Sequence, residues 1–223
     1  NYLLTGNLCT NPSTATTFYL ADQVKGIWLD EILNKLGIAK EKLPDILPIN
    51  AVIGNITAEA AKETGLMENT PVIAGSFDHP GAARATGILE EGGILLSCGT
   101  SWVGFYPSNR REALVSLKML VDPFLKYKGI WGGMFSLPRI GNNIDYLIRK
   151  WVDDSEGMYK TFNEMAEASP PGVNRLSINP MEDIKMDLSR YGKPEISRAL
   201  MEGTARLMKT RMDYYSENGL RGI

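Results

Sequence analysis

Asp78 stands at the end of the apolar run PVIAGSFD, which Pro71 opens. The run is too short for a buried helix, and we interpret it as a buried parallel strand that ends near Asp78. A carboxylate at the carboxyl end of such a strand lies where α/β folds collect their ligands, and it could accept a proton from a substrate hydroxyl. Aspartate is also a preferred helix N-cap, and Pro80 suits a first helical turn, so Asp78 could instead cap a helix over residues 80–86. One side chain can serve both roles.

A second run of small and hydroxyl-bearing residues, LLSCGTS, spans residues 95–101. Gly99 allows a close backbone approach, and the hydroxyls of Thr100 and Ser101, with exposed N–H groups, can bond phosphate oxygens. The same residues suit an ordinary hairpin, and they form neither a Walker A loop nor a dinucleotide fingerprint. His79 is the only histidine, and a structural or substrate-edge hydrogen bond is favoured for it over general-base catalysis.

The composition is that of a water-soluble globular protein: 223 residues, 43% hydrophobic and 22% charged, with a net charge of −2. Lys and Arg are scattered in runs of no more than two, which disfavours nucleic-acid binding, and no apolar run reaches the roughly 18 residues of a membrane span. Cys9 and Cys98 match no metal-ligand spacing. We therefore expect reduced thiols in a cytoplasmic protein, with neither nucleic acid nor a membrane as partner.

Periodicity and turn residues predict alternating strands and helices, and hence a mixed-sheet α/β architecture with a boundary in the turn at 90–93. The predicted strands are the run ending at Asp78, a hairpin around Gly99, and a pair within 113–135 that turns near 126–129. The predicted helices cover 28–36, 57–65 with Thr57 as cap, 80–86, 140–152, 155–168, and the stretch from Pro194 to Gly219, whose apolar positions include Ala205.

The block GSFDHPGAARATGILEEGGILLSCGTSWVGF resembles the segment that joins the two domains of the FGGY carbohydrate kinases. In that family a strand ending in Gly-x-x-Asp is followed by a small-residue helix, a glycine turn, and a strand ending in Gly-Thr-Ser. The earlier stretch LLTGNLCTNPSTAT is similar to the family's Leu-Thr-Gly loop, with Asn11 in place of Asp and Thr14 in place of Asn. RIGNNIDYLIRKW and RALMEGTARLMKTRMDYY resemble the helices that the family places next, so the resemblance covers essentially the whole chain.

The resemblance implies the actin-like ATPase superfamily fold, with two ribonuclease-H-like domains and mixed sheets, and with ligands in the cleft between the domains. Residues 1–90 would be the C-terminal part of the sugar-binding first domain. Residues 91–223 would be the N-terminal part of the ATP-binding second domain.

By the same resemblance, Asp78 is the general base that accepts the proton of a sugar hydroxyl while the γ-phosphoryl of ATP transfers, with Mg²⁺ neutralising the phosphates. Phe77 and His79, beside it, are expected substrate contacts, although Ser76-Phe77 replaces the commoner Gly-Gly and His79 replaces Asn or Gln. The resemblance assigns the ATP phosphates to Gly99, Thr100 and Ser101, and a further nucleotide contact to Gly141. No residue is assigned as a metal ligand.

The family's first phosphate loop, Asp-x-Gly-Thr, and its glycine-rich adenosine motif are missing, and residues 220–223 would only lead into the latter. The sequence is therefore expected to be the middle of an ATP-dependent kinase for a ketose or polyol, inactive on its own. One alternative is a non-catalytic sugar-binding or regulatory protein with the kinase fold. Others are a nucleotide-gated actin-like protein and an unrelated α/β domain. Because the strands that should cover 71–78 are missing, the exposed edge makes a homodimer possible.

Overall fold

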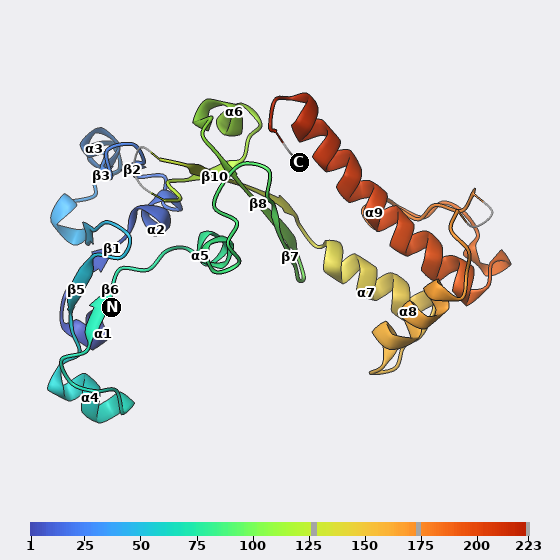
Figure 1. The fold of residues 1–223 in the computed structure, drawn as a ribbon, viewed down its shortest axis with the longest axis horizontal. Coiled ribbons are helices and arrows are strands. Elements are labelled where there is room, and N and C mark those ends of the chain that lie inside the picture. Colours follow the sequence, from blue (N-terminus) through green and yellow to red (C-terminus); the bar gives the residue numbers. More distant parts are fainter. Residues whose placement is uncertain (126–128, 173–174, 222–223) are drawn as a thin grey trace. The chain divides into compact units, whose positions relative to one another are not determined.

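The computed structural model describes residues 1–125, 129–172 and 175–221, and its chain divides into two compact units (Figure 1). The first unit consists of Asn1–Leu95 and Phe105–Phe135, and the second of Leu96–Gly104 and Ser136–Arg221. The boundary predicted between residues 90 and 91 concerns family domains rather than these compact units, and it stays a prediction.

The N-terminal part of the first unit is built from short elements. Three sheets have two strands each: β1 lies parallel to β4, β2 antiparallel to β3, and β5 antiparallel to β6. The elements are α1 (Tyr2–Thr5), β1 (Cys9–Thr10), α2 (Pro12–Thr16), β2 (Ala21–Asp22), β3 (Ile27–Trp28), α3 (Asp30–Leu36), η1 (Lys40–Lys42), β4 (Asp45–Ile46), β5 (Val52–Asn55), α4 (Ala58–Thr64), β6 (Pro71–Ile73) and α5 (Asp78–Ala85).

A four-stranded sheet in the order β7-β8-β10-β9 follows in the chain. Its strands are β7 (Leu95–Cys98), β8 (Trp102–Ser108), β9 (Leu120–Asp122) and β10 (Trp131–Leu137), with helix α6 (Arg111–Ser116) before β9. β10 runs antiparallel to β9, and the three residues between β7 and β8 allow only antiparallel pairing. The predicted hairpin around Gly99 is therefore confirmed.

The termini of helices α3 and α4 in the first unit carry the capping residues typical of helix ends. Thr57 accepts a hydrogen bond from the backbone N–H of Ala60 at 3.2 Å, which confirms it as the N-cap of α4. Gly37 and Gly65 adopt left-handed conformations after α3 and α4, where glycine costs least. Trp28 was predicted to begin a helix, but it lies in β3, and α3 begins at Asp30.

The strand predicted to end near Asp78 is shorter and more exposed than expected. β6 ends at Ile73, which is 52% exposed, and its antiparallel partner is the single strand β5. The prediction of a buried parallel strand is therefore wrong. A strand with one neighbour cannot be enclosed as a central strand of a parallel sheet is, and Gly75 and Ser76 then lead into α5 without strand pairing.

Within 113–135, the predicted pair of strands is present as β9 and β10. The prediction is wrong at its start, because α6 takes up Arg111–Ser116. The predicted turn at 126–129 lies largely outside the described residues.

The second unit is helical around one hydrophobic core. It contains α7 (Ile140–Trp151), α8 (Met158–Glu167), η3 (Leu188–Arg190) and α9 (Lys193–Glu217), which confirm the three predicted helices. Ile144 and Ile148 of α7 pack with Leu200 of α9 in this core. One predicted apolar position is wrong, because Ala205 of α9 is exposed.

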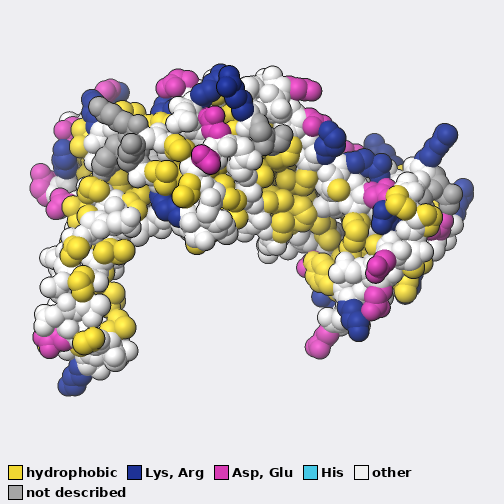
Figure 2. Space-filling view, in the orientation of Figure 1, with side chains coloured by type: hydrophobic (Ala, Val, Ile, Leu, Met, Phe, Trp, Pro, Cys, Tyr) yellow, Lys and Arg dark blue, Asp and Glu magenta, His cyan; other side chains and the backbone are white. Residues whose placement is uncertain are grey.

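The described residues of the first unit include smaller hydrophobic clusters, and part of its surface is poorly covered. Phe105, Phe124 and Met134 form one cluster with Ala83, and Trp28 belongs to another. Figure 2 shows hydrophobic side chains over the segment that carries α1, β5, β6 and α4. The side chains exposed there include Leu3 (87%), Val52 (62%) and Met67 (78%). Within the described residues, no helix is long and apolar enough to cross a membrane.

Candidate functional site

Asp78 is the first residue of α5, and its carboxylate faces solvent. Its side chain is 73% exposed, and its Oδ1 lies 3.1 Å from Nδ1 of His79. The N-cap of α5 is Phe77, so the alternative that Asp78 is the cap is wrong. Asp78 is thus an accessible carboxylate with a histidine beside it.

A buried hydroxyl holds the backbone directly before Asp78. The Oγ of Ser13, in α2, accepts the backbone N–H of Phe77 at 3.1 Å. The same Oγ donates to Oδ2 of Asp122 at the end of β9. Ser13 is 1% exposed and Asp122 is fully buried, so water does not compete for the bond between these two side chains.

Arg84, near the end of α5, holds the residue before Phe77. Its Nη1 donates to Oγ of Ser76 at 2.7 Å, and its Nη2 donates to the carbonyl oxygen of Phe124. Its guanidinium also lies 4.8 Å from the ring centroid of Phe124. Two side chains from α2 and α5 therefore fix the two residues that lead into Asp78.

Asp122 is a carboxylate in an unfavourable place. Burial raises its pKa to about 6, against the lowering effects of the Ser13 hydrogen bond and of the charge of Arg84. Its Oδ1 has no hydrogen-bond partner among the described residues. A buried carboxylate with one oxygen that lacks a hydrogen-bond partner lowers the stability of the folded protein.

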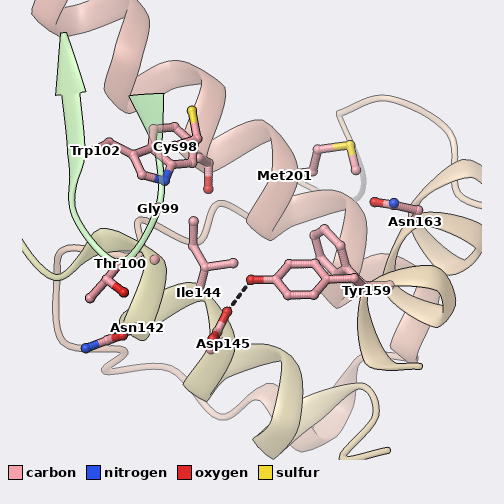
Figure 3. A pocket seen from close by; sticks show the side chains of 13 residues that line it. Cys98, Gly99, Thr100, Trp102, Asn142, Ile144, Asp145, Tyr159, Asn163 and Met201 are labelled. Atoms are coloured by element: carbon pink, nitrogen blue, oxygen red, sulfur yellow. Dashed lines mark hydrogen bonds between the residues drawn. The ribbon is translucent and has the colours of Figure 1, made fainter. Parts of the chain in front are cut away.

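The second unit contains a pocket of about 460 Å³ beside the β7–β8 turn (Figure 3). The turn, α7, α8 and α9 all contribute to its wall. The lining residues are Cys98, Gly99, Thr100, Trp102, Gly141, Asn142, Ile144, Asp145, Tyr159, Phe162, Asn163, Met201 and Thr204. Three residues that the sequence assigned to the nucleotide, Gly99, Thr100 and Gly141, thus meet in one pocket.

The turn at 99–101 is fastened to the start of α7. The backbone N–H of Gly141 donates to the carbonyl oxygen of Thr100 at 3.0 Å. A Cβ on Gly141 would overlap the carbonyl oxygen of Gly99, so only glycine permits this approach. The Oγ of Ser101 accepts the backbone N–H of Arg139, at 3.2 Å. Ser101 therefore holds the turn in place.

Sequence reasoning missed the polar pair on the opposite wall of the pocket. In Figure 3 the hydroxyl of Tyr159 points to Asp145 and donates a hydrogen bond to its carboxylate. Burial raises the pKa of Tyr159 to about 12, and the bond to Asp145 contributes to the rise. The two residues lie on different helices, α7 and α8, with no motif spacing that could have indicated their contact.

The predicted sites thus fall into two groups, one in each unit. Phe77, Asp78 and His79 belong to the first unit, and the pocket with Thr100 belongs to the second. That the two groups face one cleft stays a prediction. Among the described residues, no group of three or more His, Cys, Asp or Glu side chains could hold a metal ion. Cys9 and Cys98 are both free thiols.

Residues 1–84 match the sequence model of the FGGY family of carbohydrate kinases, N-terminal domain. The xylulose kinase of Haemophilus influenzae is 26% identical over 238 residues, covering 99% of this chain and 47% of that protein. The autoinducer-2 kinase of Yersinia enterocolitica is 32% identical over 100 residues, covering 45% of this chain and 19% of that protein. The chain spans about half the length of the xylulose kinase it matches.

Solved structures show the same fold. The xylulose kinase from Rhodospirillum rubrum superposes with a TM-score of 0.82 at 23% identity, covering 98% of this chain and 46% of that one. The Plasmodium falciparum glycerol kinase with ADP superposes with a TM-score of 0.80 at 17% identity, covering 99% of this chain and 46% of that one. These likenesses confirm the predicted α/β, actin-like ATPase fold. The match of residues 1–84 to the family's N-terminal domain and the alignment over nearly the whole chain confirm the resemblance to the FGGY carbohydrate kinases.

Proposed function

We propose that the protein carrying this chain is an ATP-dependent kinase that transfers the γ-phosphoryl group to a hydroxyl of a ketose or polyol. The match of residues 1–84 to the N-terminal domain of a carbohydrate-kinase family supports this proposal. Relatives named as xylulose and autoinducer-2 kinases support it further. Residues 1–90 would then contribute to binding the sugar, and residues 91–223 would contribute to binding the nucleotide. The reaction would draw on the ATP of the cytoplasm.

The observation that carries the proposal is the exposed carboxylate of Asp78 at the start of α5. A general base must be ionised and within reach of the proton that it removes. Asp78 is 73% exposed and lies in the first turn of α5, so a substrate hydroxyl can reach its carboxylate. In this role Asp78 accepts the proton of the attacking sugar hydroxyl. Phe77 and His79, its chain neighbours, would contact the sugar.

The pocket of the second unit supports the nucleotide half of the proposal. Gly99 and Thr100 contribute turn backbone and the small side chain of Thr100 to its wall. The N–H groups of such a turn can donate hydrogen bonds to phosphate oxygens. Gly141 keeps the start of α7 against that turn, while Ser101 holds the turn to Arg139. Bound ATP would supply the phosphoryl group, and Mg²⁺ would neutralise the charge of its phosphates.

The test measures ATP consumption by the full-length protein against a panel of pentuloses, hexuloses and polyols, for the wild type and for Asp78→Asn. We expect turnover with at least one sugar, and a fall in kcat of about 10²- to 10⁴-fold in Asp78→Asn, the usual contribution of a general base. ATP binding should persist in the variant. Asp45→Asn removes an exposed carboxylate of β4 and serves as the matched control.

Two results would contradict the proposal. Saturable sugar binding without turnover would indicate the alternative of a non-catalytic sugar-binding or regulatory protein. Full activity in Asp78→Asn would exclude Asp78 as the base.

A further inference from the structure

We propose that Ser13 and Asp122 are positioning residues for Asp78, acting through the backbone N–H of Phe77. The inference rests on the proposed function, because it assigns a task to residues behind the proposed general base. Neither residue would touch the substrate. Their task would be to fix the direction in which α5 starts, and with it the direction of the Asp78 carboxylate.

The donor and acceptor roles of the Ser13 hydroxyl determine how the hydrogen bonds run from Asp122 through Ser13 to Phe77. A serine hydroxyl has one hydrogen and two acceptor lone pairs. Ser13 gives its hydrogen to Oδ2 of Asp122, so its lone pairs are left for the N–H of Phe77 at 3.1 Å. Asp122 therefore orients the Ser13 hydroxyl, and this hydroxyl positions the backbone N–H of Phe77.

Burial makes this arrangement specific. Ser13 and Asp122 are 1% and 0% exposed, so water cannot reach either side chain in the folded protein to take the place of their hydrogen bond. A hydrogen bond to an ionised carboxylate is about twice as strong as one between neutral groups. The carboxylate lies at the end of β9, and the hydroxyl lies in α2, so the start of α5 is held from two other elements.

A hydrogen bond to the backbone of Phe77 constrains the start of α5 most directly. It is the N-cap of α5, the last residue before the helix, and its dihedral angles of −60° and 154° set the angle at which the helix begins. Ser76 is held separately by Arg84 at 2.7 Å. With both preceding residues fixed, Asp78 has only its own side-chain torsions left to sample, which is the preorganisation that a general base needs.

A stability role alone does not account for Asp122. Its carboxylate is buried with Oδ1 unpaired among the described residues, and an apolar side chain would avoid that penalty. The charged acceptor does orient the Ser13 hydroxyl more strongly than a neutral one would. The cost of burial thus accompanies a gain in the definition of the backbone at Phe77.

The first test compares the kinetics of the full-length protein with those of Ser13→Ala. We expect kcat to fall about 10- to 100-fold, the order found when a reacting group is misplaced by about 1 Å. The KM for ATP should stay unchanged. Asp122→Asn keeps an oxygen that can accept the Ser13 hydroxyl but loses the charge, so kcat should fall in this variant too, although less than in Ser13→Ala. Ser116→Ala is the matched control, because that hydroxyl bonds only within α6, to the carbonyl of Glu112.

The second test measures backbone hydrogen exchange at Phe77, and it does not depend on activity. Loss of the Ser13 acceptor should speed exchange of this amide about tenfold, the order expected for one hydrogen bond. The amide of Thr86, which bonds Ala82 at 2.9 Å at the other end of α5, should not change. The double variant Ser13→Ala/Asp122→Asn removes the same bond without leaving an unpaired charge, so it keeps the test open if Ser13→Ala does not fold.

The outcomes separate the two proposals. Faster exchange at Phe77 together with a lower kcat supports the positioning role. Unchanged exchange in a folded Ser13→Ala protein, or faster exchange with an unchanged kcat, overturns it. A wild type that phosphorylates no sugar defeats the proposed function, and the positioning role falls with it, while the exchange data would still report the contact itself.

Discussion

Asp122 should make the stability of the protein fall as the pH rises, and Asp122→Asn should remove that fall. Burial raises the pKa of this carboxyl to about 6 in the folded protein, from its ordinary value of 3.8. Between these two values the folded state holds a proton that the unfolded state has lost. Stability therefore decreases as the pH rises from about 4, and the decrease is complete above about 6.

The magnitude follows from the two pKa values. Their difference corresponds to about 3 kcal/mol of lost stability once Asp122 is fully ionised. Over a practical range, from about pH 4.5 to about pH 7.5, the same relation gives a loss of about 2 kcal/mol. Arg84 offsets only part of the burial cost, and its favourable effect is already contained in the raised pKa.

The assay is urea unfolding of the wild type and of Asp122→Asn at several pH values, followed by circular dichroism. Other groups titrate in this range, so the quantity of interest is the difference between the two pH profiles. We expect the free energies of unfolding to diverge by about 2 kcal/mol in favour of Asp122→Asn towards neutral pH. Asp45→Asn controls for removal of a surface carboxylate. Parallel profiles for the wild type and Asp122→Asn would refute the reasoning.

Three further substitutions test the fold and the pocket. Gly141→Ala should weaken ATP binding at least about tenfold, because its Cβ would push the turn at Gly99 away from α7; unchanged affinity by calorimetry would argue against this pocket as the nucleotide site. Gly203→Ala should destabilise the protein by about 1–3 kcal/mol, because its Cβ would overlap the carbonyl oxygen of Ile178, and a midpoint of unfolding equal to that of the wild type would disprove that close approach. Thr57→Ala should cost about 1 kcal/mol through loss of the α4 cap, a value that urea unfolding can check against Thr57→Ser, which keeps the hydroxyl.

The helices could be predicted because their signals are local. Thr57 caps α4, Gly37 and Gly65 follow α3 and α4, and the apolar spacing of α7 matches its buried face. The strand before Asp78, in contrast, was predicted less accurately than the helices. Its apolar residues indicated burial, but burial of a strand depends on neighbours that its own sequence does not specify, and here it has one.

The site shows the same division between local and distant signals. Resemblance to the family singled out Thr100 and Gly141, and the structure places both at one pocket. The contact of Ser13 with Asp122 joins residues 109 positions apart, which no spacing rule anticipates. A carboxylate within the apolar stretch LVDPF was nonetheless a usable warning, because a charge in a buried strand requires a partner.

Trp102 gives the pocket a built-in optical reporter. Its indole lines the wall beside Thr100 and packs on the hydrophobic core of the second unit. Trp28 and Trp131 belong to the first unit, and Trp151 of the second unit does not line this pocket, so a ligand that enters it contacts the fluorophore at position 102 directly. Exclusion of water from that indole should shift its emission towards the blue. Nucleotide affinity could then be titrated without any turnover, and without first knowing the sugar.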